Sequence, residues 1–172
     1  TRSSSVTGVQ TCALPILGRP LVASFCASCK HSLEDYAATL PEDEGREWKQ
    51  KCQGLSALLT RPRVRGIGHA PAVVAYHQPC HWNAADPDLP LLKPGLPGLR
   101  KGTGLCCGMG GILKMSNPGL SMDMARRCFE GFAPEARAVI TGCSGCVMQL
   151  ASAAPKGVEV RHWLDIVDVE TA

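Results

Sequence analysis

Short apolar runs alternate along the chain with segments of helical character. Residues 21–25, 72–76 and 138–141 have the length and composition of strands buried in a parallel sheet, and residues 158–160 predict one further short strand. Helices are expected over residues 29–40, 44–59, 145–153 and 162–169, and after a start signal at Ser116-Asn-Pro118. Strands that alternate with helices predict an α/β fold with a mainly parallel sheet and flanking helices.

Two of the expected helices carry an apolar stripe that includes a cysteine. The stripes are Trp48, Cys52, Leu55 and Leu59 in one helix, and Leu120, Met124, Cys128 and Phe132 in the other. Cysteines in such stripes are expected to be buried structural thiols. Proline, glycine and charged residues predict a linker over 61–68, and 86–104 is expected to hold little regular structure beyond a turn of helix.

Composition narrows the classes of function. The chain has 172 residues, of which 45% are hydrophobic, so a real core is expected. Its net charge of +3 is spread along the sequence and gives no footprint for nucleic acid. No run approaches the ~18 to 20 apolar residues of a transmembrane helix, so no transmembrane segment is expected.

The first residues differ in character from the rest. Residues 1–17 show no periodicity and no helix cap, and they resemble a peptide that recurs where a sequencing adapter has been translated at the end of a metagenomic contig. We therefore expect residues 1–17 to be a non-native or disordered leader on a chain truncated upstream. Cys12 in this leader is assigned no function.

An internal repeat organises the remaining sequence. Cys26-x-x-Cys29 and Cys143-x-x-Cys146 each follow an expected strand and precede an expected helix, with a leucine four residues past the second cysteine. The chain thus reads as the tail of one cysteine-rich repeat followed by a complete second repeat. The expected divisions are 1–17 for the leader, 18–68 for the first-repeat remnant and linker, and 69–172 for the complete repeat.

Ten cysteines are the most distinctive feature of the composition. Three expected strands run into Cys26, Cys80 and Cys143, and ligands collect beyond the carboxyl ends of parallel strands. The adjacent pair Cys106-Cys107 lies in a glycine-rich loop that could close over this edge. The five thiols expected to converge there are Cys80, Cys106, Cys107, Cys143 and Cys146.

The chemistry of these thiols favours a cluster. Five thiols exceed the four ligands of a tetrahedral zinc ion, whereas adjacent cysteines can reach different irons of one cluster. Gly108, Gly110, Gly111 and Gly145 would let backbone N–H groups approach the cofactor, and a helix that begins near Gly145 points its positive end there. A structural four-cysteine zinc site that uses only one of the adjacent pair remains an alternative.

Two histidines flank Cys80 in the sequence. His77 and His81 could donate hydrogen bonds to the site, but a strand-end histidine is expected first to be satisfied by a backbone carbonyl.

Three motifs together carry a resemblance to a known family. Tyr76-His-Gln-Pro-Cys80-His81, Cys106-Cys-Gly-Met-Gly-Gly111 and Thr141-Gly-Cys-Ser-Gly-Cys146 resemble the CCG cysteine-rich domain. That domain usually occurs twice in the iron–sulfur subunit of glycolate oxidase, in lactate-utilisation iron–sulfur proteins, in anaerobic glycerol-3-phosphate dehydrogenase and in heterodisulfide reductase. The resemblance extends over roughly residues 21–169.

The resemblance implies a [4Fe–4S] cluster, with a noncubane form as one option. By similarity its metal ligands are the five convergent cysteines, while Cys26 and Cys29 are either ligands of the preceding repeat's site or remnants of it. The implied function is an electron-transfer subunit of a glycolate/lactate-type dehydrogenase complex. An FAD-containing dehydrogenase subunit would be the electron donor and a quinone-like molecule the acceptor. A cytoplasmic location, or attachment at the inner membrane through the complex, is expected.

The same resemblance leaves a second redox function open. In the heterodisulfide-reductase branch the five-cysteine set cleaves a disulfide, so direct disulfide reduction is an alternative to electron relay. The structural zinc module has no redox role and is the alternative from a different functional class.

Overall fold

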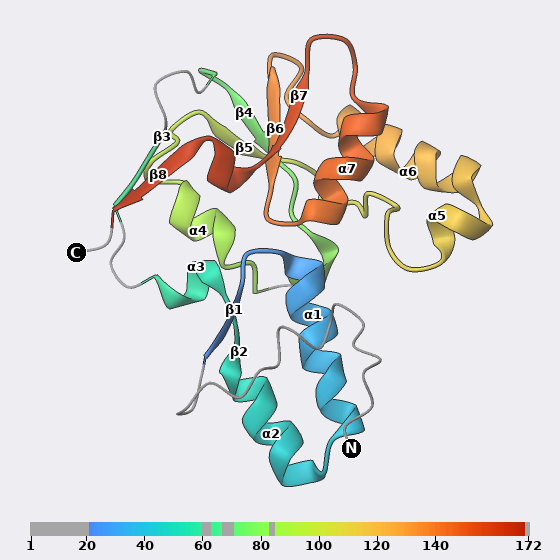
Figure 1. Ribbon diagram of the computed structural model, residues 1–172. Coiled ribbons are helices and arrows are strands. Elements are labelled where there is room, and N and C mark those ends of the chain that lie inside the picture. Colours follow the sequence, from blue (N-terminus) through green and yellow to red (C-terminus); the bar gives the residue numbers. More distant parts are fainter. Residues whose placement is uncertain (1–20, 60–62, 67–70, 83–84, 171–172) are drawn as a thin grey trace, which may run out of the picture.

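The computed structural model describes residues 21–59, 63–66, 71–82 and 85–170 (Figure 1). The expected leader at residues 1–17 lies outside this range. So do parts of the expected 61–68 linker.

A parallel sheet forms the centre of the molecule. It contains β4 (Val74–Tyr76), β5 (Leu99–Lys101), β6 (Ala138–Thr141) and β7 (Glu159–His162), in the spatial order β5-β4-β6-β7. Every neighbouring pair in it is parallel, with Ala75 aligned to Val139 at the centre. The prediction of an α/β fold with a mainly parallel sheet is confirmed.

Alternation along the central strands builds a core on each face of the sheet. Ala75 and Val139 face a cluster that includes Cys128 of α6 (Pro118–Glu130) and Leu150 of α7 (Ser144–Ala153). Figure 1 shows these two helices side by side against the sheet. The proline at the first position of α6 and the Asn117 side chain that accepts from the Leu120 N–H explain why this helix starts where the sequence predicted.

The opposite face of the sheet carries a second core. Val74, Tyr76 and Ile140 pack there against α4 (Asp88–Leu92) and against Trp163 of a 3₁₀ turn, η4 (Trp163–Asp165). A second 3₁₀ turn, η3 (Cys80–Trp82), begins at the cysteine that follows β4. The buried strands are thus covered on both sides, as parallel sheets require.

The segment before residue 60 forms a lobe at one end of the sheet (Figure 1). Its strands β1 (Val22–Ser24) and β2 (Cys52–Gly54) pair in parallel. Its helical elements are α1 (Ala27–Asp35), the 3₁₀ turn η2 (Tyr36–Thr39), α2 (Glu42–Lys51) and α3 (Leu55–Leu58).

The prediction of one continuous helix over 44–59 is wrong at Cys52–Gly54, where strand β2 separates α2 from α3. The chain leaves α2 at Lys51 and forms β2, because Cys52–Gly54 aligns with β1 in a parallel ladder. The cysteine in the predicted stripe is nevertheless buried, with 1% of Cys52 exposed. Tertiary strand pairing here overrides an apolar spacing that also suits a helix.

The prediction of a helix over 162–169 is also wrong. After η4 the chain forms β8 (Val167–Glu170), which pairs antiparallel with β3 (Arg63–Gly66) inside the expected linker. Val167 and Val169 alternate with polar residues, which is the period of a strand. In the region expected to be mostly irregular, β5 joins the central sheet as an edge strand.

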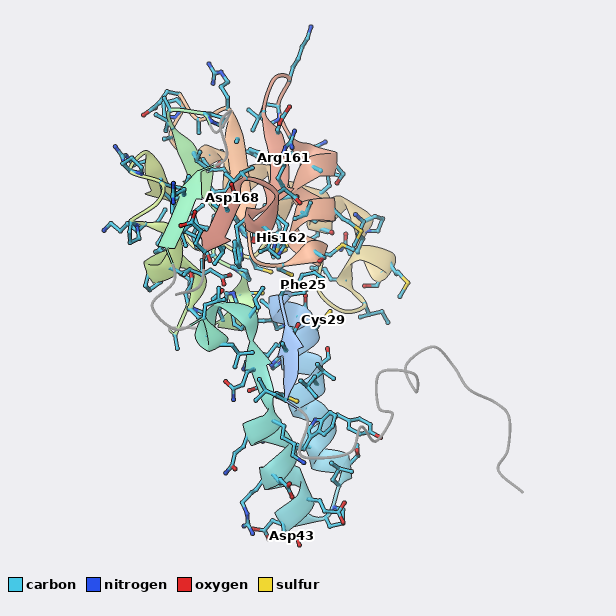
Figure 2. All side chains as sticks on the ribbon, turned by 60° about the vertical axis from the view of Figure 1, so that its left-hand side comes forward. Phe25, Cys29, Asp43, Arg161, His162 and Asp168 are labelled. Carbon is cyan, nitrogen blue, oxygen red and sulfur yellow. The ribbon has the colours of Figure 1, made fainter. Side chains whose placement is uncertain are left out.

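Polar contacts at Ala27 and Phe25 join the first lobe to the ends of two sheet strands. The Ala27 N–H donates to the Gly142 carbonyl at 2.9 Å, and Nε2 of His162 lies 3.0 Å from the Phe25 carbonyl. Nδ1 of His162 accepts from the Leu164 N–H, so the proton is on Nε2, which donates to Phe25. Figure 2 shows Phe25 and His162 together at this junction.

A transmembrane helix must be both long and apolar, and the helices in the described ranges do not meet this requirement. None of them is both long enough and apolar enough to span a membrane.

Candidate metal centre where the lobe meets the sheet

Six cysteine sulfurs form a continuous series where the lobe meets the sheet. Each sulfur either contacts the next one directly or shifts the pKa of the next thiol through a hydrogen bond between them. In spatial order the series is Cys80, Cys106, Cys107, Cys146, Cys143 and Cys26. Five of these are the thiols expected to converge, and the sixth comes from the lobe before residue 60.

The middle of the series is buried and includes a histidine. The sulfurs of Cys107 and Cys146 lie 3.3 Å apart, and each residue is no more than 3% exposed. The ring of His77, at the end of β4, faces them: its nitrogen and the two sulfurs all lie within 4.8 Å of one another. These three side chains can therefore donate to one metal ion.

One end of the series reaches the surface. The sulfur of Cys106 lies 4.0 Å from that of Cys80, which is exposed at the start of η3. The Gly108 N–H donates to the Cys106 sulfur at 3.4 Å. Gly108 has φ +81°, and a β-carbon there would lie 2.7 Å from the Ser121 carbonyl oxygen, so this turn requires glycine.

The other end of the series crosses from the sheet domain to the lobe before residue 60. The sulfurs of Cys143 and Cys26 lie 4.0 Å apart, and both residues are buried. The Ser28 hydroxyl lies 2.8 Å from the Cys143 sulfur, and the Ser144 N–H donates to the Cys26 sulfur at 3.4 Å. Hydrogen-bond donors from both helix starts thus face this pair.

Two thiols in the series are ionised more readily than an ordinary cysteine. Hydrogen bonding by Cys106, Cys146 and His77 lowers the pKa of Cys107 far below its usual range. Hydrogen bonding by Cys146, and then by Cys26 and Ser28, lowers the pKa of Cys143 in the same way.

Their neighbours hold protons more tightly in return. Hydrogen bonding to Cys107 and Cys143 raises the pKa of Cys146, and Cys107 raises the pKa of Cys106. Contact with Cys143 and burial raise the pKa of Cys26. Cys107 and Cys143, whose pKa values are lowered, are therefore each flanked by thiols whose pKa values are raised. Thiolates are the form in which cysteine binds metals.

The spacing of the sulfurs fits thiolate coordination. Four thiolates at ~2.3 Å from a tetrahedral metal are separated from one another by ~3.8 Å. The separations of 3.3, 4.0 and 4.0 Å in this series lie around that value. Sulfur donors of this kind suit zinc and iron–sulfur clusters.

A comparison with protein families also indicates metal or cluster binding. Residues 74–151 match the family model of the CCG cysteine-rich domain. The matched segment contains the five cysteines expected to converge and also Cys128, and its clustered thiols indicate metal or cluster binding. Searches of curated proteins and of solved structures found no match to the chain.

The remaining predicted site residues take different places around the CCG domain. Cys29 is exposed on α1 (Figure 2). Gly145 lies in the first turn of α7, where a β-carbon would be 3.8 Å from the Cys143 sulfur. Gly110 and Gly111 lie in the loop after Cys107, in positions where a β-carbon would meet nothing within 4 Å. Contact of these residues with a cofactor stays a prediction.

The structure adds two donors to the CCG domain that sequence reasoning undervalued. The His77 side chain faces Cys107 and Cys146. The signal for it was present, because His77 follows a buried strand immediately. Ser28 lies within one Cys-x-x-Cys motif but contacts a cysteine of the other, and no local pattern shows such a contact.

Proposed function

We propose that this chain is an iron–sulfur electron-transfer component of a glycolate/lactate-type dehydrogenase complex. The observation that carries the proposal is the divergence of the adjacent cysteines. Cys106 approaches Cys80, whereas Cys107 approaches Cys146. Neighbouring thiols that serve opposite ends of a donor series suit a centre with several metal atoms better than one four-coordinate ion.

The surroundings of the thiols support a redox role. A bound iron–sulfur cluster would supply one-electron transfer at a potential set by its ligands, by hydrogen bonds to sulfur and by solvent exposure. The chain provides such hydrogen bonds from the Gly108 and Ser144 N–H groups and from the Ser28 hydroxyl. It also buries the inner thiols, which keeps water away from them.

The exposed end of the series suits exchange of electrons with a partner. Cys80 is exposed, and Leu105, Ile112 and Met115 beside the Cys106-Cys107 loop are 47%, 71% and 79% exposed. Apolar side chains in the open are typical of surfaces that meet other molecules. In the proposed complex, an FAD-containing subunit supplies electrons and a quinone-like molecule receives them. The complex is proposed to be cytoplasmic, attached at the inner membrane through other subunits.

Anaerobic reconstitution of the full chain with iron and sulfide tests the proposal. We expect about four irons and four sulfides per chain, with broad charge-transfer absorption that bleaches on reduction. Cys80→Ser should lose this absorption, and Cys128→Ala, which alters a buried thiol outside the series, should keep it. A chain that takes up no iron and sulfide would contradict the proposal.

A mononuclear zinc centre is the second candidate, and a specific observation favours it. His77, Cys107 and Cys146 by themselves provide three buried donors within 4.8 Å of one another. With Cys143 or Cys106 as the fourth ligand, they would form a closed structural zinc site. Such a site predicts one zinc per chain that survives Cys80→Ser but is lost or weakened in His77→Ala.

A further inference from the structure

Cys26 lies as close to its neighbour in the series as Cys80 does, although Cys80 belongs to the CCG motif and Cys26 does not. Its sulfur lies 4.0 Å from that of Cys143, the same separation that joins Cys80 to Cys106. Cys26 is 4% exposed, whereas Cys80 is exposed. By distance and burial, Cys26 is therefore at least as well placed as Cys80 to share a metal.

The environment of Cys26 and Cys143 is reciprocal. Each cysteine immediately precedes a helix, α1 or α7, and each sulfur contacts a group in the first turn of the other helix. Ser144 of α7 donates its N–H to Cys26, and Ser28 of α1 places its hydroxyl against Cys143. Two positive helix ends therefore converge on one pair of sulfurs, an arrangement that stabilises anionic groups.

The backbone fixes this approach from both sides. The Ala27 N–H, next to Cys26, donates to the carbonyl of Gly142, next to Cys143. One residue before Cys26, the Phe25 carbonyl accepts from His162 at the end of β7. Hydrogen bonds on both flanks of Cys26 thus hold it against the sheet, one beside Cys143 and one at the end of β7.

We propose that Cys26 is a thiolate ligand of the metal centre in the CCG domain, contributed across the repeat boundary. The centre then takes six thiols from two repeats, and Cys29 of the same motif is not among them. This inference rests on the proposed metal centre but not on the metal's being iron. Without the lobe before residue 60, the donor set would be incomplete.

The first experiment compares Cys26→Ser with Cys29→Ser in the full chain. After anaerobic reconstitution, Cys29→Ser should match the unmodified chain in iron content and in the electron paramagnetic resonance spectrum of the reduced state. Cys26→Ser should lose iron or change that spectrum. If Cys26→Ser is indistinguishable from Cys29→Ser, the inference is overturned while the proposed function stands.

A titration with Co²⁺ alone separates the inference from the choice of metal. Thiolate ligation gives sulfur-to-cobalt charge-transfer absorption, whose intensity per bound cobalt reports the number of thiolates. Cys26→Ser should weaken binding and lower that intensity. Loss of an outer-shell partner can itself weaken binding by ~10- to 100-fold, so the intensity is the deciding measurement. Weaker binding at unchanged intensity would make Cys26 a positioning residue and overturn its role as a ligand. If iron and sulfide fail but this result holds, the inference survives and the proposed electron-transfer function does not.

A measurement on the unmodified chain covers the case in which Cys26→Ser does not fold. Iodoacetamide modification is followed by mass spectrometry with and without Co²⁺. The control for burial is Cys52, which is 1% exposed and lies in β2, outside the series. Cobalt should slow modification of Cys26 ~10-fold or more relative to Cys52. Equal slowing of the two cysteines would overturn the inference.

Discussion

Asp88 lies against Gly142 so closely that any side chain at residue 142 would overlap the aspartate carboxylate. The carboxylate cannot swing away freely, because it accepts hydrogen bonds from Ser56 and, at 2.8 Å, from Nε1 of Trp82. Trp82 follows Cys80 by two residues, and Gly142 immediately precedes Cys143. One buried carboxylate thus connects the segments that carry two of the predicted ligands.

We expect Gly142→Ala to destabilise the protein by about 1–3 kcal/mol, the usual cost of overpacking a filled interior. It should also reduce metal uptake, because relief of the overlap displaces Cys143. Urea unfolding and metal analysis check both effects. Gly119→Ala is the control, since a β-carbon there meets only the Asn117 side chain, at 3.9 Å. Equal stability of the two variants would contradict the assigned overlap.

The charge of Asp88 should make stability depend on pH. Burial raises the pKa of Asp88 to about 6, from 3.8. Between these values the folded chain holds a proton that the unfolded chain has released, so stability falls as pH rises through this range. A shift of about two units corresponds to about 3 kcal/mol.

Asp88→Asn should remove this dependence, because the amide is neutral at every pH and can still accept from Trp82. We expect the variant to be more stable than the unmodified chain by up to about 3 kcal/mol above pH 6, with the difference shrinking towards pH 4. Denaturant unfolding across this range measures it. The exposed Asp168→Asn is the control (Figure 2), and a difference independent of pH would contradict the assignment.

The sequence predicted the elements whose signals are local. The run at 138–141 forms β6, and a helix accompanies each Cys-x-x-Cys motif: α1 begins directly after Cys26 and α7 directly after Cys143. The prediction failed where pairing with a distant strand determines the secondary structure. Cys52–Gly54 fits a helical stripe but pairs with β1. Convergence of the five thiols followed from sheet topology alone. The approach of Cys26 to Cys143 did not, because it depends on how the lobe before residue 60 packs against the sheet.

Cys128 is expected to be structural, as its position in an apolar stripe predicted. Its thiol donates to the Leu105 and Cys106 carbonyls at 3.6 Å each, behind the Cys106-Cys107 loop. Burial raises the pKa of Cys128 to about 11, so the thiol is neutral near pH 7. Cys128→Ala should lower the free energy of unfolding by about 1–2 kcal/mol and leave the metal content unchanged. Metal loss as large as that in Cys107→Ser would contradict this role.

Ser28 should tune the centre without binding it. Its hydroxyl lies 2.8 Å from the Cys143 sulfur, and hydrogen bonds to cluster sulfurs favour the more negative, reduced state. Removal of this donor in Ser28→Ala should therefore lower the reduction potential. If the bond contributes about 1 kcal/mol more to the reduced state, the shift is ~40 mV for one electron.

Ser144→Ala is the matched control for this measurement. Ser144 contacts Cys26 through its backbone N–H, which alanine retains, so its side-chain loss should leave the potential in place. An anaerobic redox titration of the reconstituted chain, followed by visible absorption, compares the two variants. Equal potentials in both would show that the Ser28 hydroxyl does not act on the centre. A lower potential in Ser28→Ala alone would place the Cys143 and Cys26 end of the series among the groups that set the potential, because the Ser28 hydroxyl lies 2.8 Å from the Cys143 sulfur and 3.6 Å from the Cys26 sulfur.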